Sequence, residues 1–210
     1  MAELYDEEAE HTGWLGPEVA FGLIFEYLKP GQTVLDIGIG TGRAAILFRK
    51  AGLTVHGMDI SEDMLNICRV KGFTVLRQHD LLTSPYPFAS EQFDHVICVG
   101  LLYFFKDLSP FFSETTRILA KGGKLVFIIG DRAETDSMEF VLNTVYSESD
   151  HPITIYRHSI RQIDTWLEEN GFFRKRYLGF TAYMDRKKTQ NFQMKAYLVE
   201  KNVGIEYDSY

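Results

Sequence analysis

The sequence predicts an α/β protein whose sheet is covered by helices on both faces. Short runs rich in Val, Ile and Leu alternate with stretches of helical periodicity, which is the pattern of successive strand–helix units. The run at 93–100 is apolar almost throughout, as expected for a central strand. With 210 residues, 45% of them hydrophobic, the chain is expected to form a single domain over residues 1–210.

Composition and charge disfavour several classes of partner. Five acidic residues and no basic one lie in residues 1–10, so the formal net charge of −7 leaves only −2 for the rest of the chain. A nearly neutral body is poorly suited to a nucleic-acid backbone. The longest apolar run, 96–105, is shorter than the roughly 20 residues that span a bilayer. We therefore expect neither a nucleic-acid nor a membrane partner.

The N-terminal sequence and the cysteine content predict a cytoplasmic protein without a metal site. The acidic start lacks the basic and apolar regions of a signal peptide. Cys68 and Cys98 form no metal-ligand spacing and are expected to be reduced residues of the core.

The first strand and the turn after it are the centre of the pattern. After a helix over 17–28, residues 34–37 form an apolar strand that contains Asp36. A glycine-rich turn with Gly38, Gly40 and Gly42 follows, and a helix begins near residue 44. Such a turn directs free backbone N–H groups and the helix dipole at a ligand above the sheet edge.

A nicotinamide dinucleotide is one candidate for that ligand. Its fingerprint places glycines at the first, third and sixth positions of the turn, and the sixth position here is Arg43. A nicotinamide-dependent oxidoreductase is therefore kept only as a less favoured alternative.

Two further strands are expected to end in acidic residues. The strand at 53–59 ends in Asp59, and an acid at this strand tip suits the hydroxyls of a ribose. Ser61 then caps a helix that contains Met64. The strand at 73–81 contains Asp80 near its end, where capping of a turn is the alternative role.

The second half of the chain is less regular. A helix from 109, a strand over 124–129, a helix from 159 and strands over 176–183 and 192–200 are expected. Residues 131–158 are polar and lack a regular pattern.

These motifs together resemble those of the class I S-adenosylmethionine-dependent methyltransferases. Val34-Leu35-Asp36-Ile37-Gly38-x-Gly40-x-Gly42 resembles motif I of that family, Asp59-Ile60-Ser61-x-x-Met64-Leu65 its second motif and Phe93-Asp94 the start of its motif IV. The resemblance covers residues 18–130 well and the later helix and strands loosely. It implies a Rossmann-like three-layer sandwich with a seven-stranded, mostly parallel sheet whose last strand is antiparallel.

The resemblance also implies a cofactor and its site. The cofactor is S-adenosyl-L-methionine, with S-adenosyl-L-homocysteine as product, and Asp80 or its neighbour is the acceptor for the adenine amino group. The cofactor-binding residues implied or inferred are Asp36, Gly38, Gly40, Gly42, Asp59, Ile60, Met64, Asp80, Leu81, Val99 and Trp14. Residues 1–30 correspond to an N-terminal lid and helix, with packing of Tyr5 and Trp14 on that helix as the alternative. Residues 131–158 lie where the family inserts substrate-recognition elements.

The expected function is methyl transfer to a small-molecule acceptor through an undetermined O, N, C or S atom. Strand four is followed by Leu101-Leu102-Tyr103-Phe104-Phe105, not by the Asn/Asp-Pro-Pro-aromatic tetrad of methyltransferases that act on nucleic-acid amines and glutamine. The chain is expected to be a monomer or a homodimer. No catalytic base is assigned, although His11, His151 and His158 lie outside the expected strands. A non-catalytic S-adenosylmethionine-binding protein of the same fold is the main alternative.

Overall fold

A mostly parallel sheet forms the middle layer of the molecule. The computed structural model describes residues 2–142, 153–183, 187–189 and 191–203. The parallel strands, in spatial order, are β3 (Val75–Gln78), β2 (Thr54–Asp59), β1 (Thr33–Ile37), β4 (Phe93–Cys98) and β5 (Leu119–Asp131). Beyond β5 lie β9 (Asn191–Lys201), which is antiparallel to β5, and β8 (Phe172–Tyr183), which pairs with β9. The predicted Rossmann-like fold, with its last strand antiparallel, is confirmed.

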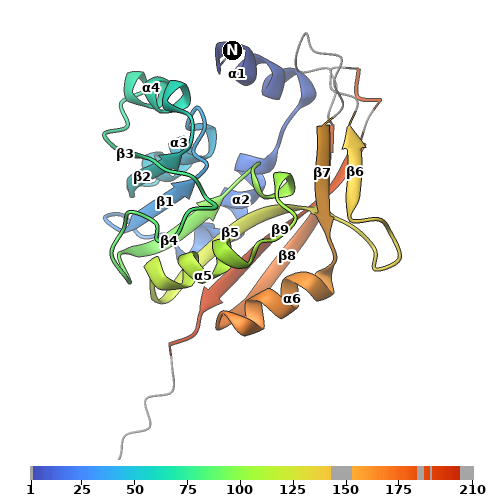
Figure 1. Ribbon diagram of the computed structural model, residues 1–210. Helices are drawn as coiled ribbons and strands as arrows, with labels where there is room; N and C mark the ends of the chain where they lie inside the picture. Colours follow the sequence, from blue (N-terminus) through green and yellow to red (C-terminus); the bar gives the residue numbers. More distant parts are fainter. Residues whose placement is uncertain (1, 143–152, 184–186, 190, 204–210) are drawn as a thin grey trace, which may run out of the picture.

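Helices cover both faces of this sheet (Figure 1). The helices on one face are α2 (Gly16–Ile24), which is followed by the short helix η1 (Phe25–Tyr27), α3 (Arg43–Lys50) and α4 (Glu62–Val70). Those on the other face are α5 (Ser109–Ile118) and α6 (Ile160–Glu169). Successive strand residues point to opposite faces, so Val34 joins one apolar cluster and Leu35 the other. Both residues are fully buried, which explains the continuous apolar runs in the sequence.

Two local predictions have clear outcomes. Ser61 caps α4, because its Oγ accepts a hydrogen bond from the Met64 backbone N at 3.3 Å, as expected. The third strand was predicted to extend through residue 81, but it ends at Gln78. Asp80 therefore lies in the turn beyond β3, and its Oδ1 accepts from the Leu82 backbone N at 2.9 Å.

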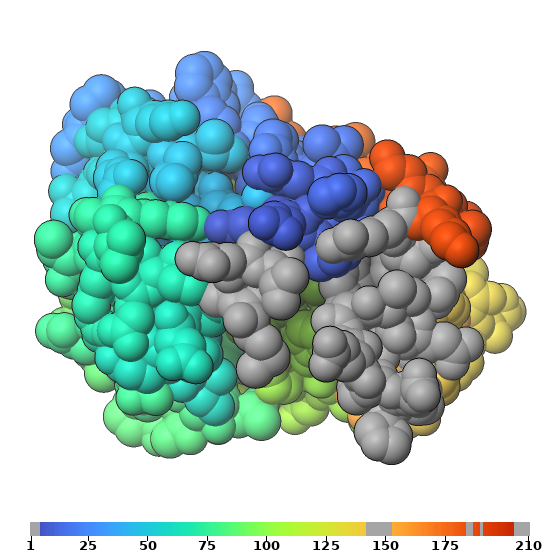
Figure 2. Space-filling view, turned by 90° about the horizontal axis from the view of Figure 1, so that it is seen from above, coloured from blue at the N-terminus to red at the C-terminus, as the bar shows by residue number. Residues whose placement is uncertain are grey.

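The N-terminal segment forms a helix of its own, α1 (Ala2–Thr12). The strand tips at the carboxyl edge of the sheet lie beneath it (Figure 1). Seen from above, α1 lies between the side of the molecule formed by α3 and α4 and the side formed by the C-terminal strands (Figure 2).

The region expected to be irregular contains a hairpin. Its strands, β6 (Glu139–Leu142) and β7 (Ile153–His158), pair antiparallel with each other. β7 also pairs in parallel with the end of β5, through Gly130 and Asp131. A short helix, η2 (Leu102–Phe104), follows β4. Within the described residues, no helix has the length and apolar character needed to cross a membrane.

Candidate functional site

The glycine turn between β1 and α3 is held against the end of β2. The backbone N atoms of Gly38 and Ile39 both donate to Met58 O, at 2.7 and 3.1 Å. Gly38 has φ +72°, and a Cβ there would lie 2.5 Å from Leu101 Cδ2. Glycine is therefore required at this position by both backbone conformation and space.

The third glycine of the motif permits close packing. A Cβ on Gly42, at φ +83°, would lie 2.7 Å from the ring of Phe73 and 3.4 Å from Cys68 Sγ. Gly42 thus lets α3 begin close to α4 and β3.

Asp59 connects the glycine turn to the turn that follows β2. Its Oδ2 accepts from the Gly40 backbone N at 2.8 Å, and its Oδ1 accepts from the Ser61 backbone N at 2.9 Å. Each carboxylate oxygen has a further lone pair, so the group can also accept hydrogen bonds from a ligand. The side chain is only half-buried, which leaves it accessible.

A cavity of about 260 Å³ lies on the side of Gly38 that faces β2 and β3. Five of the predicted residues line it: Gly38, Asp59, Ile60, Asp80 and Leu81. Its other lining residues include Met58, His79, Leu101 and Phe105, so the walls are mainly apolar with polar groups from the strand tips. We call this the larger cavity.

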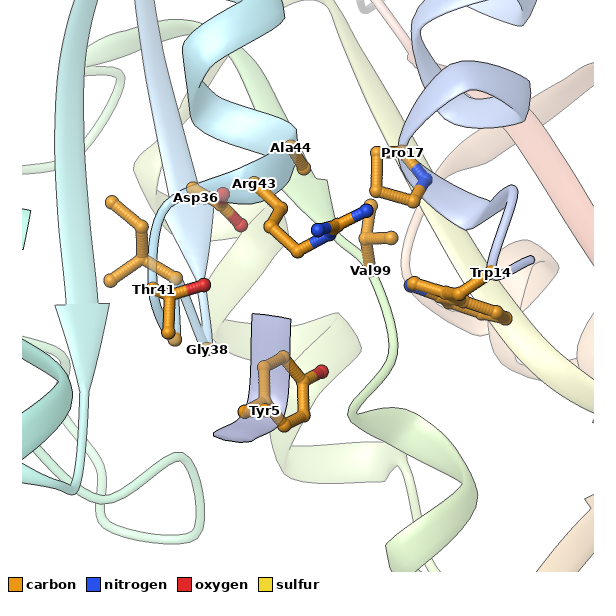
Figure 3. A pocket seen from close by; sticks show the side chains of 11 residues that line it. Tyr5, Trp14, Pro17, Asp36, Gly38, Thr41, Arg43, Ala44 and Val99 are labelled. Atoms are coloured by element: carbon orange, nitrogen blue, oxygen red, sulfur yellow. The ribbon is translucent and has the colours of Figure 1, made fainter. Parts of the chain in front are cut away.

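A second cavity, of about 30 Å³, lies on the other side of Gly38 beneath α1 (Figure 3). We call it the smaller cavity. The predicted residues that line it are Trp14, Asp36, Gly38, Gly40 and Val99, and the others include Tyr5, Thr41 and Arg43. Gly38 lines both cavities, so they meet at the glycine turn.

The smaller cavity brings groups of opposite charge together. Asp36 is only 2% exposed, and burial, reinforced by the nearby Asp59 carboxylate, raises its pKa well above the usual range. Arg43 Nε is buried and has no hydrogen-bond partner among the described residues. An acid and a cation at one small cavity suit a ligand group that itself carries both charges.

Two predicted residues line neither cavity. Gly42 packs against Phe73, and Met64 contributes the backbone N that Ser61 caps. The resemblance placed both in the cofactor site, and the structure uses both to build the framework around it.

Of the three histidines outside the expected strands, the two that the structure describes line neither cavity. His11 is exposed on α1, and its Nδ1 lies 2.9 Å from Glu7 O. His158 was expected in a loop, but it is fully buried at the end of β7, where burial lowers its pKa. Its Nε2 lies 3.2 Å from Lys106 O. His151 lies outside the described residues.

The sequence reasoning missed several lining residues. Leu101 and Phe105 belong to an aromatic stretch, and its position directly after the central strand was the available signal. Arg43 was used only to argue against a dinucleotide, yet its position at the start of α3 was a signal that it faces the ligand side. Tyr5 lies in the N-terminal segment that the family resemblance implies to be a lid, but it was not among the predicted cofactor-binding residues.

Comparison with known proteins gives consistent results. Residues 35–127 match the profile of a family described as a methyltransferase domain. An uncharacterised protein of Methanocaldococcus jannaschii is 31% identical over 180 residues, which is 80% of each chain. A crystal structure of an S-adenosylmethionine-dependent methyltransferase from Methanosarcina mazei has a TM-score of 0.74 at 14% identity, covering 87% of this chain and 98% of that one.

A further structural neighbour contains bound ligands. The 1,6-didemethyltoxoflavin-N1-methyltransferase of Burkholderia thailandensis, solved with 1,6-didemethyltoxoflavin and S-adenosylhomocysteine, has a TM-score of 0.64 at 14% identity. The match covers 89% of this chain and 78% of that one. At these identities the two crystal structures support the fold alone.

Proposed function

The chain belongs to the class I S-adenosylmethionine-dependent methyltransferases, and we propose that it is an active enzyme that methylates a small molecule. S-adenosylmethionine is its cofactor. The observation that supports our placement of the cofactor is that two cavities of different character meet at Gly38. One is roomy and mainly apolar, and the other is small and charged.

The larger cavity suits the adenosine part of the cofactor. The Asp59 carboxylate borders it and can accept hydrogen bonds from the two ribose hydroxyls. Ile60 and Leu81 offer apolar surface to the adenine ring, and the Asp80 carboxylate is an acceptor for its amino group. Cofactor binding by these four residues is a prediction from the sequence and the family resemblance, and the four roles are proposals.

The smaller cavity suits the amino-acid part. The buried Asp36 carboxylate offers a partner to the cofactor's ammonium group, and Arg43 Nε offers an unused donor to its carboxylate. A cation beside the buried Asp36 carboxyl would stabilise its ionised form, and a carboxylate would satisfy the unpartnered Nε of Arg43, so a zwitterionic group suits both residues.

The bound cofactor supplies a methyl group on a sulfonium, which is electrophilic without further activation. This chain's own residues are then needed mainly to hold the two reactants in line and to exclude water. Trp14 and Val99 line the smaller cavity and are placed to cover the amino-acid part of the cofactor (Figure 3). We assign no catalytic base.

Three features support a small-molecule acceptor over a nucleic acid. The body of the chain is nearly neutral, and the tetrad that binds planar amines is missing after β4. Aromatic side chains also gather beside the β6–β7 hairpin, where Phe140 contacts Phe192 and Phe192 contacts Tyr103. We propose that this hairpin contributes to acceptor recognition and that α1 acts as a lid.

We propose that the protein is cytoplasmic. Cys68 and Cys98 are both free and buried, which fits the cytoplasm. A monomer or homodimer without membrane attachment is the expected state.

Two experiments test the proposal in sequence. S-adenosylhomocysteine at a hundredfold excess over Kd should stabilise the protein by about 2.7 kcal/mol, whereas NAD should not. Stabilisation by NAD alone would support the oxidoreductase alternative.

The protein is then incubated with S-adenosylmethionine labelled on its methyl group. The acceptor mixtures are a fractionated small-molecule extract and, separately, bulk RNA, DNA and protein. Label in a small-molecule fraction supports the proposal, and efficient labelling of a polymer contradicts it. Binding without transfer to any acceptor indicates the non-catalytic alternative.

A further inference from the structure

Asp6 connects α1 to the glycine turn and to the end of α4, at the edge of the smaller cavity. Its Oδ1 accepts from Thr41 Oγ1 in the glycine turn at 2.6 Å, and its Oδ2 lies 2.7 Å from Lys71 Nζ at the end of α4. Lys71 Nζ also donates to Thr41 O at 2.9 Å. The side chains of Asp6 and Lys71 are 27% and 30% exposed, and Thr41 is buried. These contacts are therefore charge-assisted and only partly open to water.

The contacts of Asp6 hold its neighbour Tyr5 at the cavity. Tyr5 projects from α1 toward the glycine turn and lines the smaller cavity with Arg43 (Figure 3). The Arg43 guanidinium is tied to the same helix, with Nη1 3.4 Å from Asp6 O and 3.7 Å from Glu10 Oε1. α1 thus covers the end of the site that we assign to the amino-acid part of the cofactor.

The cavity beneath α1 is small. Its volume of about 30 Å³ compares with the ~10–15 Å³ that a single water molecule needs on the same measure. Outward movement of α1, which carries Tyr5, would enlarge this cavity for the amino-acid part of the cofactor.

We infer that Asp6 is a latch that controls entry and exit of the cofactor by holding α1 over the glycine turn through Thr41 and Lys71. The inference rests on the proposed function, and it goes beyond a lid in naming the contacts that hold the lid closed. The latch acts on the rates of exchange, because opening of α1 breaks the contacts of Asp6 with Thr41 and Lys71 both for cofactor entry and for cofactor exit.

The test measures the kinetics of S-adenosylhomocysteine binding by stopped flow in full-length variants. Asp6→Asn keeps the shape of the side chain and removes its charge. Glu7→Gln is the matched control, because Glu7 is an exposed acid on the same helix. We expect Asp6→Asn to raise both the association and the dissociation rate constants about 5- to 30-fold, with a smaller change in Kd. Glu7→Gln should leave both rates unchanged.

Lys71→Met provides a second variant that removes the other partner of the ion pair. It should raise both rates as Asp6→Asn does, and the double variant should add little, because the two residues share one interaction. High salt should speed exchange in the native protein more than in Asp6→Asn.

Hydrogen exchange of α1 in the unliganded protein gives an independent readout. Exchange should be faster in Asp6→Asn than in Glu7→Gln, because the latch is absent only in the first. Equal exchange in the two variants overturns the latch. Unchanged rate constants, or a rise in dissociation alone, overturn it as well, since Asp6 would then contribute to affinity and not to gating. A native protein that does not bind S-adenosylhomocysteine at all refutes the proposed function instead.

Discussion

Replacing Asp59 should affect both the stability of the fold and the binding of the cofactor, and the two effects can be separated. The position of Asp59 at a strand tip predicts a role at the ribose of the cofactor. The structure shows that its carboxylate also accepts from the backbone N atoms of Gly40 and Ser61, at 2.8 and 2.9 Å. Asp59→Ala removes both acceptors, whereas the amide of Asp59→Asn can replace only one of them.

The size of each effect follows from these contacts. A buried N–H without a partner costs about 1–3 kcal/mol, and partial access to water reduces this. We therefore expect losses in the free energy of unfolding of about 2 kcal/mol for Asp59→Ala and about 1 kcal/mol for Asp59→Asn. Loss of charge-assisted hydrogen bonds to the ribose adds a binding penalty of about 1.5–3 kcal/mol, or roughly 10- to 150-fold in Kd.

Denaturant unfolding without ligand and calorimetric titration with S-adenosylhomocysteine measure the two quantities. Asp63→Asn is the matched control, since Asp63 is an exposed acid in the first turn of α4 and lines neither cavity. Affinity retained in Asp59→Asn despite a loss of stability would show that the carboxylate serves the fold alone and would refute its role at the ribose.

Three further perturbations test the neighbouring groups. Gly38→Ala should lower the free energy of unfolding by about 1–3 kcal/mol and abolish cofactor binding, because its Cβ would lie 2.5 Å from Leu101. Gly22→Ala is the control, because a Cβ there has nothing within 4 Å, and it should change neither stability nor binding. Thermal shifts with and without S-adenosylhomocysteine measure both effects. Arg43→Met should weaken binding of S-adenosylhomocysteine about tenfold but leave the affinity for 5′-methylthioadenosine unchanged, because that ligand lacks the amino-acid part. An equal loss of affinity for both ligands in calorimetry would exclude a contact between Arg43 and the amino-acid part. Asp36 has a folded pKa above its unfolded value, so native stability should fall as pH rises from the usual carboxyl range through the folded pKa. Unfolding measured across pH should show a flatter profile for Asp36→Asn, and an identical profile would contradict a titrating Asp36.

The centre of the fold could be predicted because its determinants are local in the sequence. The run from Val34 to Ile37 is buried on both faces and is followed at once by glycines with positive φ, so strand, turn and helix follow from neighbouring residues. Asp59 was located by the same reasoning one strand later. Most of the predicted site residues therefore line the two cavities.

The parts that escaped prediction depend on contacts between distant residues. α1 is polar and acidic, and Asp6 reaches partners 35 and 65 residues further along the chain. Cofactor binding by Gly42 and Met64 stays a prediction, because neither residue lines the two cavities and a motif does not show which way each position faces. The strands β6 and β7 are short and separated in sequence, so neither had a periodicity strong enough to recognise.

The β6–β7 hairpin is attached to the rest of the sheet in a way that favours divergence. Only the pairs Gly130–Arg157 and Asp131–His158 join it to β5, whereas β5 pairs along much of its length with β4 and β9. Mutations that lengthen, shorten or rebuild the hairpin beyond those two pairs leave the strand registers around the glycine turn intact. The hairpin surface can therefore change during evolution while the strands that hold the glycine turn keep their pairing.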